Sequence, residues 1–204
     1  MILDPDAISS GAMYRFMVGV VVPRPIAFVS TVGADGRFNV APFSYFNAIT
    51  NRPPLIGISI NLRGGEPKDT LRNIRATGDF VVNTVDEPLT ARMVHASGDW
   101  PEGVSEFELT GLTPVASDRV KSPRVAESPV SLECRLHREI ELGDTTLVVG
   151  EILRAHIADR VLTEGRVDIE KLKPVGRLGG DGYTIVRDLF HLPRPKVGGP
   201  TSGG

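Results

Sequence analysis

The segment 61–70 contains the residues best suited to bind an anion. A predicted strand ends there, two glycines follow, and a predicted helix begins near Pro67. Backbone N–H groups in the first turn of a helix have no partner within the helix and attract anions. Arg63 and Lys68 add positive charge at a helix end where cations are usually unfavourable, which is reasonable if a phosphate lies between them. The alternative is a solvated turn in which Asp69 offsets Lys68.

Two neighbouring segments, 23–31 and 39–50, are unusually rich in hydroxyl and amide side chains, and Thr70 adds a further hydroxyl near the predicted anion site. Strands that serve packing alone rarely carry so many polar groups. We therefore expect a surface that hydrogen-bonds a flat, polar ligand. The polar residues of the two segments are Ser30, Thr31, Asn39, Ser44, Asn47 and Thr50.

His156 and Arg177 are the other candidates for chemistry. In the segment 153–157 apolar residues alternate with Arg154 and His156, so these two should point away from the core, toward solvent, a cleft or a partner chain. An exposed histidine without a role is the alternative. Arg177 precedes three glycines within 179–182 and could reach an anionic ligand or a neighbouring subunit. A tight turn before the last strand would explain the same glycines.

Other kinds of site find no support in the sequence. There is no nucleophile elbow, no Walker motif and no glycine fingerprint of a dinucleotide-binding domain. Cys134, the only cysteine, lies within a predicted strand, where a buried apolar role is more common than a nucleophilic one. The histidines show no metal-ligand spacing, so we expect no structural zinc and no other metal.

The composition indicates one ordinary globular domain. The chain has 204 residues, a formal charge of -2 and 41% hydrophobic residues. This charge gives no reason to expect nucleic acid or a membrane surface as a partner. No apolar run is long enough to span a membrane, and the acidic N-terminus lacks the pattern of a secretory signal. We expect a cytoplasmic protein.

Strand signals dominate the chain, and helices are few. Because the strands follow one another through short turns, we expect a mainly antiparallel sheet, and the number of strands indicates a small barrel. The predicted strands are Ile26–Val32, Phe38–Ile49, Leu55–Asn61, Phe80–Val85, Val130–Leu142, Thr145–Ile157 and Gly182–Arg187. The predicted helices are Ser10–Val18, Pro67–Thr77 and Leu89–Ala96, with a helical turn within Val161–Leu172.

Six sequence blocks, taken in order, resemble the flavin reductase-like family. This family of FMN-binding split β-barrel proteins includes flavoredoxin and the reductase components of two-component monooxygenases. The resemblance implies a homodimeric, antiparallel split barrel over residues 1–195, with FMN near the subunit interface. The tail at 196–204 has no counterpart in this resemblance, and we expect it to be disordered because it is too rich in glycine to fold unaided. The blocks are Pro23–Ala27, Asn39–Ser44, Asn51–Leu55, Lys68–Ile74, Thr77–Asn83 and Arg177–Gly180.

The resemblance also implies a function and roles for residues. It suggests hydride transfer from NADH or NADPH, a transient co-substrate, to flavin, with reduced flavin passed to a monooxygenase. The alternatives are an FMN-binding electron carrier and, fitting the blocks less well, a relative of the pyridoxamine-phosphate oxidases. His156 would position the nicotinamide, a purpose that Arg154 or Arg177 could also serve, and Arg177 would contact the cofactor. The implied flavin contacts are Ser30, Thr31, Asn47, Ala48 and Ile49, and the implied phosphate contacts are Arg63, Lys68, Asp69 and Thr70.

Overall fold

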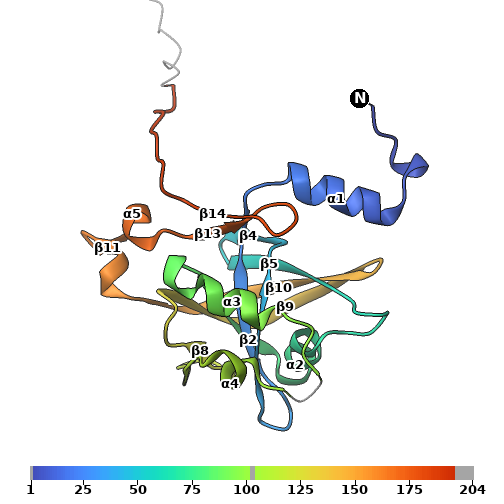
Figure 1. The fold of residues 1–204 in the computed structure, drawn as a ribbon. Helices are drawn as coiled ribbons and strands as arrows, with labels where there is room; N and C mark the ends of the chain where they lie inside the picture. Colours follow the sequence, from blue (N-terminus) through green and yellow to red (C-terminus); the bar gives the residue numbers. More distant parts are fainter. Residues whose placement is uncertain (1, 102–103, 196–204) are drawn as a thin grey trace, which may run out of the picture.

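A seven-stranded antiparallel sheet forms the body of the protein (Figure 1), and the predicted mainly-β class with few helices is confirmed. The computed structural model describes residues 2–101 and 104–195, so the predicted tail at 196–204 lies outside the described residues. In spatial order the strands are β3 (Phe38–Phe43), β2 (Ala27–Val32), β6 (Asp79–Asn83), β9 (Val130–Leu142), β10 (Thr145–Ile157), β5 (Pro54–Asn61) and β4 (Phe46–Asn51).

The sheet has a seam between its two edges. Strands β3 and β4 are the edge strands, yet only Ser44 and Tyr45 separate them in the chain. The sheet must therefore curl until its edges approach one another, and the N–H of Ser59 in β5 donates to the carbonyl of Tyr45 at 2.8 Å. Because β3 and β4 do not pair in the described part of the chain, the sheet does not close into a continuous barrel, which is compatible with the predicted split barrel. The strand predicted over Phe38–Ile49 is two strands.

Three small sheets complete the β-structure. β1 (Arg24–Pro25), β13 (Val175–Arg177) and β14 (Tyr183–Ile185) form one of them, in the order β1-β13-β14. The other two are short hairpins, which are β7 (Pro114–Val115) with β8 (Arg124–Val125) and β11 (Leu162–Thr163) with β12 (Arg166–Val167).

The helices lie on the two faces and at one end of the large sheet. They are α1 (Ser10–Val20), α2 (Asp69–Thr77), α3 (Thr90–Ala96), α4 (Glu106–Thr110) and α5 (Ile169–Leu172), with single 3-10 turns η1 (Pro5–Ala7), η2 (Glu87–Leu89) and η3 (Asp159–Val161). Local capping residues begin α1 and end α2, because the Ser9 hydroxyl accepts from the N–H of Ala12 and Gly78 ends α2 with φ 74°. The sequence gives no sign of α4.

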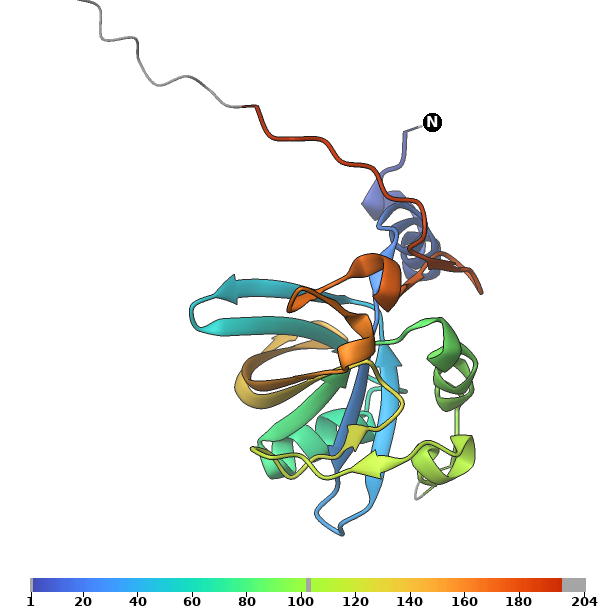
Figure 2. The ribbon, with the colours of Figure 1, turned by 90° about the vertical axis from the view of Figure 1, so that its left-hand side faces the viewer.

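Both faces of β2 are buried, which explains why the chain has two core clusters. On one face, Ala27 and Val29 pack with the inward residues of β5, β6 and β10 and with Leu71 and Ile74 of α2. On the other face, Phe28 packs beneath α3 and α4. In Figure 2 these two helices lie along one side of β2 and β3, while the hairpin of β4 and β5 curls away on the other side.

A glycine permits close packing in the first cluster. A Cβ at Gly150 in β10 would lie 2.4 Å from the ring of Phe80, so only glycine leaves room for this aromatic side chain. The strand is irregular at this point, since the pairing of β9 with β10 shifts between Val149 and Gly150. Bulges of this kind bend a strand and increase its twist. The local sequence of β10 thus helps the sheet to curl.

The N-terminal helix and the C-terminal segment project from the same end of the body in both views (Figures 1 and 2). Several large apolar side chains on them are exposed, among them Tyr14, Phe16 and Val20 of α1 and Phe190 and Leu192 near the C-terminus. Within the described residues, no helix is long and apolar enough to cross a membrane.

Candidate functional site

The connection between β5 and α2 directs the first residues of α2 toward a cleft. Arg63 and Glu66 exchange backbone hydrogen bonds of 2.8 and 3.0 Å. Gly64 and Gly65 between them have φ values of 58° and 87°, which glycine adopts far more readily than other residues. Lys68 occupies the N-cap position of α2, and its side chain makes no capping hydrogen bond to the helix. The first N–H groups of α2 therefore need partners from outside the helix.

Lys68 and Arg63 form a cationic pair at this helix end. Lys68 is half-buried, and its Nζ lies 5.9 Å from the centroid of the Phe43 ring. Burial and then the charge of Arg63 lower the pKa of Lys68, while Asp99 acts in the opposite direction. Arg63 contacts Asp99 at 2.6 Å, where the Asp99 side chain is 89% exposed. An anion held between Lys68 and Arg63 would favour the charged form of Lys68.

A hollow of about 260 Å³ opens in front of this helix end. The structure brings the four predicted phosphate contacts together in its wall. Asp69 adds a negative charge, but this carboxylate forms an ion pair with Arg72. Trp100 faces the same hollow, although nothing in the sequence around it indicated a site. The four residues that meet here are Arg63, Lys68, Asp69 and Thr70.

A buried polar network supports the hollow from below. The Thr70 hydroxyl donates to Asn39 Oδ1 at 3.0 Å, and Asn39 Nδ2 donates to Glu106 Oε2 at 2.8 Å. Burial raises the pKa of the Glu106 carboxyl, although the hydrogen bonds that it accepts oppose this effect. Thr31 joins the network by donating to Asn39 Oδ1 at 3.4 Å, and its hydroxyl accepts from Asn73 Nδ2 at 3.0 Å. Polarity in its strand pointed to Asn39, whereas no sequence signal pointed to Glu106.

Two further hollows, of about 190 and 200 Å³, adjoin the first one. All three are lined by Pro42 and Phe43, and the two additional hollows are also lined by Ser44 and Tyr14. These residues lie at or next to the seam between β3 and β4. We call the three hollows together the seam cleft. It extends from Lys68 at one end to Arg177 at the other.

The second end of the seam cleft is also cationic. The Arg177 guanidinium carbon lies 4.4 Å from the centroid of the Tyr183 ring, and Nη2 donates to the carbonyl of Gly180 at 2.5 Å. Arg177 belongs to β13, whose partner β1 contributes Arg24 directly opposite. A backbone carbonyl of the turn that contains Gly180 thus holds the Arg177 side chain. This contact accounts for part of the glycine content of the segment.

Comparison with known proteins then identifies the family. Residues 18–171 match the model of the flavin reductase like domain. The chain belongs to this family. Among solved structures, nitrilotriacetate monooxygenase component B from Bacillus cereus is 37% identical, with a TM-score of 0.92 over 94% of this chain and 98% of that one. The resemblance drawn from the sequence blocks is therefore confirmed.

Two other solved members of the fold broaden the comparison. The 2-nitrobenzoate 2-nitroreductase NbaA from Pseudomonas fluorescens is 33% identical, with a TM-score of 0.89 over the whole of both chains. Flavoredoxin from Desulfovibrio vulgaris (Miyazaki F) is 25% identical, with a TM-score of 0.78 over 94% of this chain and 97% of that one. The flavin reductase-like fold thus occurs in proteins described as oxygenase components, nitroreductases and flavoredoxins.

In this flavin reductase-like chain, the predicted ligand contacts Ser30 and Thr31 are fully buried. The Ser30 hydroxyl donates to the carbonyl of Pro123 at 2.5 Å and accepts from Asn83 Nδ2 at 2.9 Å. Thr31 is held by Asn73, as described above. Both hydroxyls are engaged inside the protein, so neither side chain reaches the seam cleft. The two side chains lie within the protein interior. A contact between these residues and the flavin stays a prediction.

The predicted contacts Asn47, Ala48 and Ile49 lie on the edge strand β4 and are exposed. None of them lines the seam cleft of a single chain. Their backbone pairs with β5 on one side only, because β4 ends the sheet. A role in binding the flavin ring stays a prediction for these residues.

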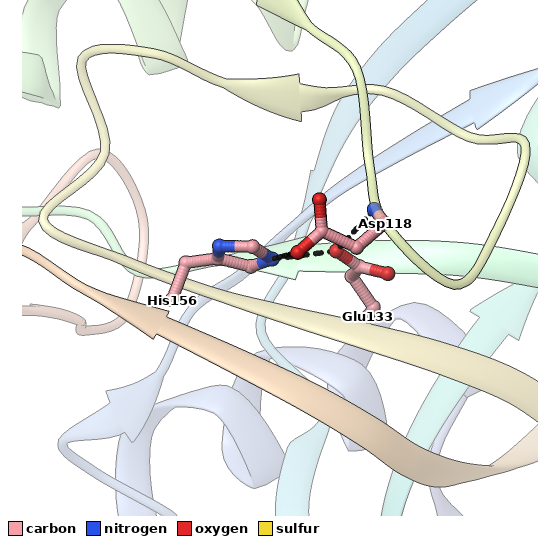
Figure 3. A group of neighbouring side chains, drawn as sticks. All are labelled: Asp118, Glu133 and His156. Atoms are coloured by element: carbon pink, nitrogen blue, oxygen red, sulfur yellow. Dashed lines mark hydrogen bonds and ion pairs between the residues drawn. The ribbon is translucent and has the colours of Figure 1, made fainter.

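His156 is placed in a cluster with Asp118 and Glu133 (Figure 3). Its Nε2 lies 2.5 Å from Glu133 Oε1, and the fully buried Glu133 also accepts the backbone N–H groups of Asp118 and Arg119. Burial would raise the pKa of Glu133, but the Asp118 amide, His156 and the Arg119 amide together lower it. His156 does not line the seam cleft. Positioning of nicotinamide by His156 stays a prediction.

The same cluster has the composition of a metal site but is arranged as a hydrogen-bonded group. Two ligands of one zinc ion, each about 2.0 Å from it, would lie roughly 3 Å apart. The nitrogen of His156 and the oxygen of Glu133 are closer, at hydrogen-bonding distance. Asp118 is engaged by Arg154 at 2.6 Å, and this positive charge disfavours a cation. These contacts join strands β9 and β10 to the loop that carries Asp118.

Proposed function

We propose that this chain binds FMN in the seam cleft and transfers hydride from NADH or NADPH to the flavin. The observation that carries the proposal is the pairing of half-buried Lys68 with Arg63 at the N-terminus of α2. A phosphate monoester would supply the negative charge and the hydrogen-bond acceptors that this helix end requires. Membership of the flavin reductase-like family supports flavin as the group that carries the phosphate.

The residues of the cleft fit the parts of FMN. The cofactor has a phosphate, a polyol chain and a flat ring system with one apolar and one polar edge. The cleft offers the cationic helix end for the phosphate, and Phe43 and Pro42 provide an apolar wall beyond it. The hydroxyls of Ser44 and Ser59 are available to a polyol chain in the adjoining hollow. Carbonyls and amides of the exposed edge strand β4, which lies outside the hollows of a single chain, would meet the polar edge of the ring where the ring extends beyond the cleft.

The protein contributes binding and orientation to the reaction. Lys68, Arg63 and the N–H groups of α2 would hold the phosphate, and Thr70 would be fixed at the helix end by its bond to Asn39. Phe43 and Trp100 would exclude water from the cofactor. When bound, the flavin supplies the hydride-accepting chemistry, so no side chain has to act as a strong acid or base. This agrees with the lack of a catalytic pair in the sequence.

Association with other proteins forms part of the proposal. Exposed apolar side chains on α1 and on the C-terminal segment support a homodimer, because such surfaces commonly mark protein contacts. The solved oxygenase component B supports a role in supplying reduced flavin to a monooxygenase.

A flavoredoxin is among the similar structures, and it favours a second candidate function. In that case the chain would be an electron carrier that retains its FMN and exchanges electrons with a protein partner. The two functions differ in whether nicotinamide reduces the flavin rapidly.

The visible spectrum of the purified protein, followed by anaerobic titration with NADH and NADPH, tests both functions. Flavin absorbance that is bleached by either donor, with turnover on added FMN, supports the reductase. Bound FMN that neither donor reduces supports the carrier. A protein that neither contains flavin nor shifts the spectrum of added FMN would refute both.

A further inference from the structure

Two arginines face one another across the short pairing of β1 with β13. Arg24 and Arg177 are directly opposite in this antiparallel register, so their side chains leave the same face. Like charges in this position repel each other and destabilise a strand pair. Arg24 is also only 5% exposed, whereas arginine is seldom buried without a charged partner.

Among the described residues, no carboxylate neutralises this pair. Arg24 donates from Nη1 to the carbonyls of Val18 and Val21, both at 2.9 Å, from Nη2 to the carbonyl of Leu178 at 3.0 Å, and from Nε to the Ser44 hydroxyl at 3.3 Å. All of these acceptors are uncharged. Within the part of the chain that the structure describes, neither arginine forms an ion pair. Two positive charges are therefore concentrated at one place.

This place is the far end of the seam cleft. Arg177 lines it, and the Ser44 side chain that also lines it is hydrogen-bonded to Arg24. The other end already carries the cations assigned to the FMN phosphate, and FMN has no second phosphate. The cation pair at Arg177 thus has no partner within the flavin. The second reactant of the proposed function does carry such a group, because a nicotinamide dinucleotide contains a pyrophosphate.

We propose that Arg177, with the charge of Arg24 behind it, binds the pyrophosphate of the nicotinamide dinucleotide. The inference rests on the proposed function. Guanidinium groups recognise phosphate oxygens with two parallel hydrogen bonds, and the contact of Arg177 with the Tyr183 ring helps to hold its guanidinium in place. Arg177 is thereby a residue for the hydride donor and not for the flavin.

The test compares hydride donors with and without a pyrophosphate. In Arg177→Ala, kcat/KM for NADH should fall on the order of 10- to 100-fold, the effect of losing charge-assisted hydrogen bonds. With dihydronicotinamide riboside, which has no phosphate, kcat/KM should stay within about twofold of the unmodified protein, and the Kd for FMN should not change. Arg177→Lys should recover part of the loss.

The control is Arg187→Ala. Arg187 is an exposed arginine in the same C-terminal region that contacts Glu87, and its removal should leave both donors unaffected. Equal losses with both donors in Arg177→Ala would show that Arg177 only maintains the structure. Unchanged kinetics with NADH would also overturn the proposal.

Calorimetry with inorganic pyrophosphate gives a readout that does not depend on flavin. The flavin-free protein should bind pyrophosphate in the Lys68→Ala variant, where the other cationic end is weakened. Binding should be lost when Arg177→Ala is added to this variant. If the protein takes up no FMN but loses pyrophosphate binding in the double variant, the proposed flavin function is refuted and the anion site at Arg177 is supported. Binding that survives in the double variant would refute the site itself.

Discussion

Replacement of Lys68 by alanine should have opposite effects on FMN binding and on the flavin-free fold. Lys68 sits half-buried beside Arg63, and both burial and that neighbouring charge lower its pKa. In the flavin-free protein the ammonium group is therefore held in an unfavourable place. We expect Lys68→Ala to weaken FMN while leaving the free energy of unfolding of the flavin-free protein unchanged or slightly higher.

The size of the effect on binding follows from the contacts. A hydrogen bond to a charged group contributes about 1.5 to 3 kcal/mol. Arg63 and the N–H groups of α2 remain in the variant and retain part of the binding, so a loss of about 1 to 3 kcal/mol is expected. Because about 1.4 kcal/mol corresponds to a factor of ten, the Kd for FMN should rise roughly 5- to 150-fold.

Two measurements on the same preparation are needed. Quenching of flavin fluorescence gives the Kd for FMN, and urea unfolding of the flavin-free protein gives its stability. Lys121→Ala is the matched control, since Lys121 is an exposed lysine outside the seam cleft. It should change neither quantity.

The reasoning would be refuted by either of two results. An unchanged Kd would remove Lys68 from the phosphate site. A flavin-free protein destabilised by more than about 1 kcal/mol would show that Lys68 supports the fold through its packing on Phe43, as buried aliphatic stems of lysine can do.

Three other substitutions test the surroundings of the cleft. Folding raises the pKa of Glu106, so the stability that its protonated form contributes is greatest at low pH and is lost as the pH rises through that pKa. The melting temperature of Glu106→Gln, relative to that of the unmodified protein, should therefore increase from pH 4 to pH 8. A difference in melting temperature that stays constant with pH would contradict this. His156→Ala should lower stability, because it removes a partner of buried Glu133, without changing the Kd for FMN; unaltered stability with slower reduction by NADH would instead support a role with nicotinamide. Gly150→Ala should cost about 1 to 3 kcal/mol of unfolding free energy because its Cβ meets Phe80, and Phe80→Leu should recover part of this loss; additive losses would exclude the clash.

Secondary-structure elements that depend on residues close together in the chain were predicted from the sequence. The strands over Val130–Leu142 and Thr145–Ile157 have the predicted bounds, because a Gly-Asp turn joins two long stretches of strand-forming residues. The helix ending at Thr77 was also found from its own sequence, since its apolar spacing and the following Gly78 are local signals. The end of the seam cleft at Lys68 is formed by the N-terminus of this helix, so it was predicted together with the helix.

Features that depend on distant parts of the chain were not predicted. The break at Ser44 and Tyr45 follows from the curling of the whole sheet, and no signal within the polar segment marks it. Strands β1 and β13 have two and three residues and exist only because they meet across the fold. The sequence therefore could not show that Arg24 and Arg177 lie opposite one another.

Polarity alone did not show which groups the Ser30 hydroxyl meets. A strand residue with a hydroxyl was expected to face a ligand, but here it faces Asn83 and the carbonyl of Pro123. Sequence shows that such a group needs a partner, and only the packing of β6 and of the loop at Pro123 shows which partner it has. For this reason the residues of the buried network were less predictable than those of the exposed helix end.

The seam at Ser44 and Tyr45 has a consequence for the order in which the protein assembles. The two strands that it joins, β3 and β4, are neighbours in sequence. In the sheet they are connected only through the hydrogen-bonded strands β2, β6, β9, β10 and β5, and some paired residues of these strands are up to about a hundred positions apart in the chain. Pairings between such distant segments form late and make folding slow. The floor of the cleft is thus completed only after synthesis has passed Ile157, so a nascent or truncated chain has no place for the ligand until the last strand of the ladder has docked.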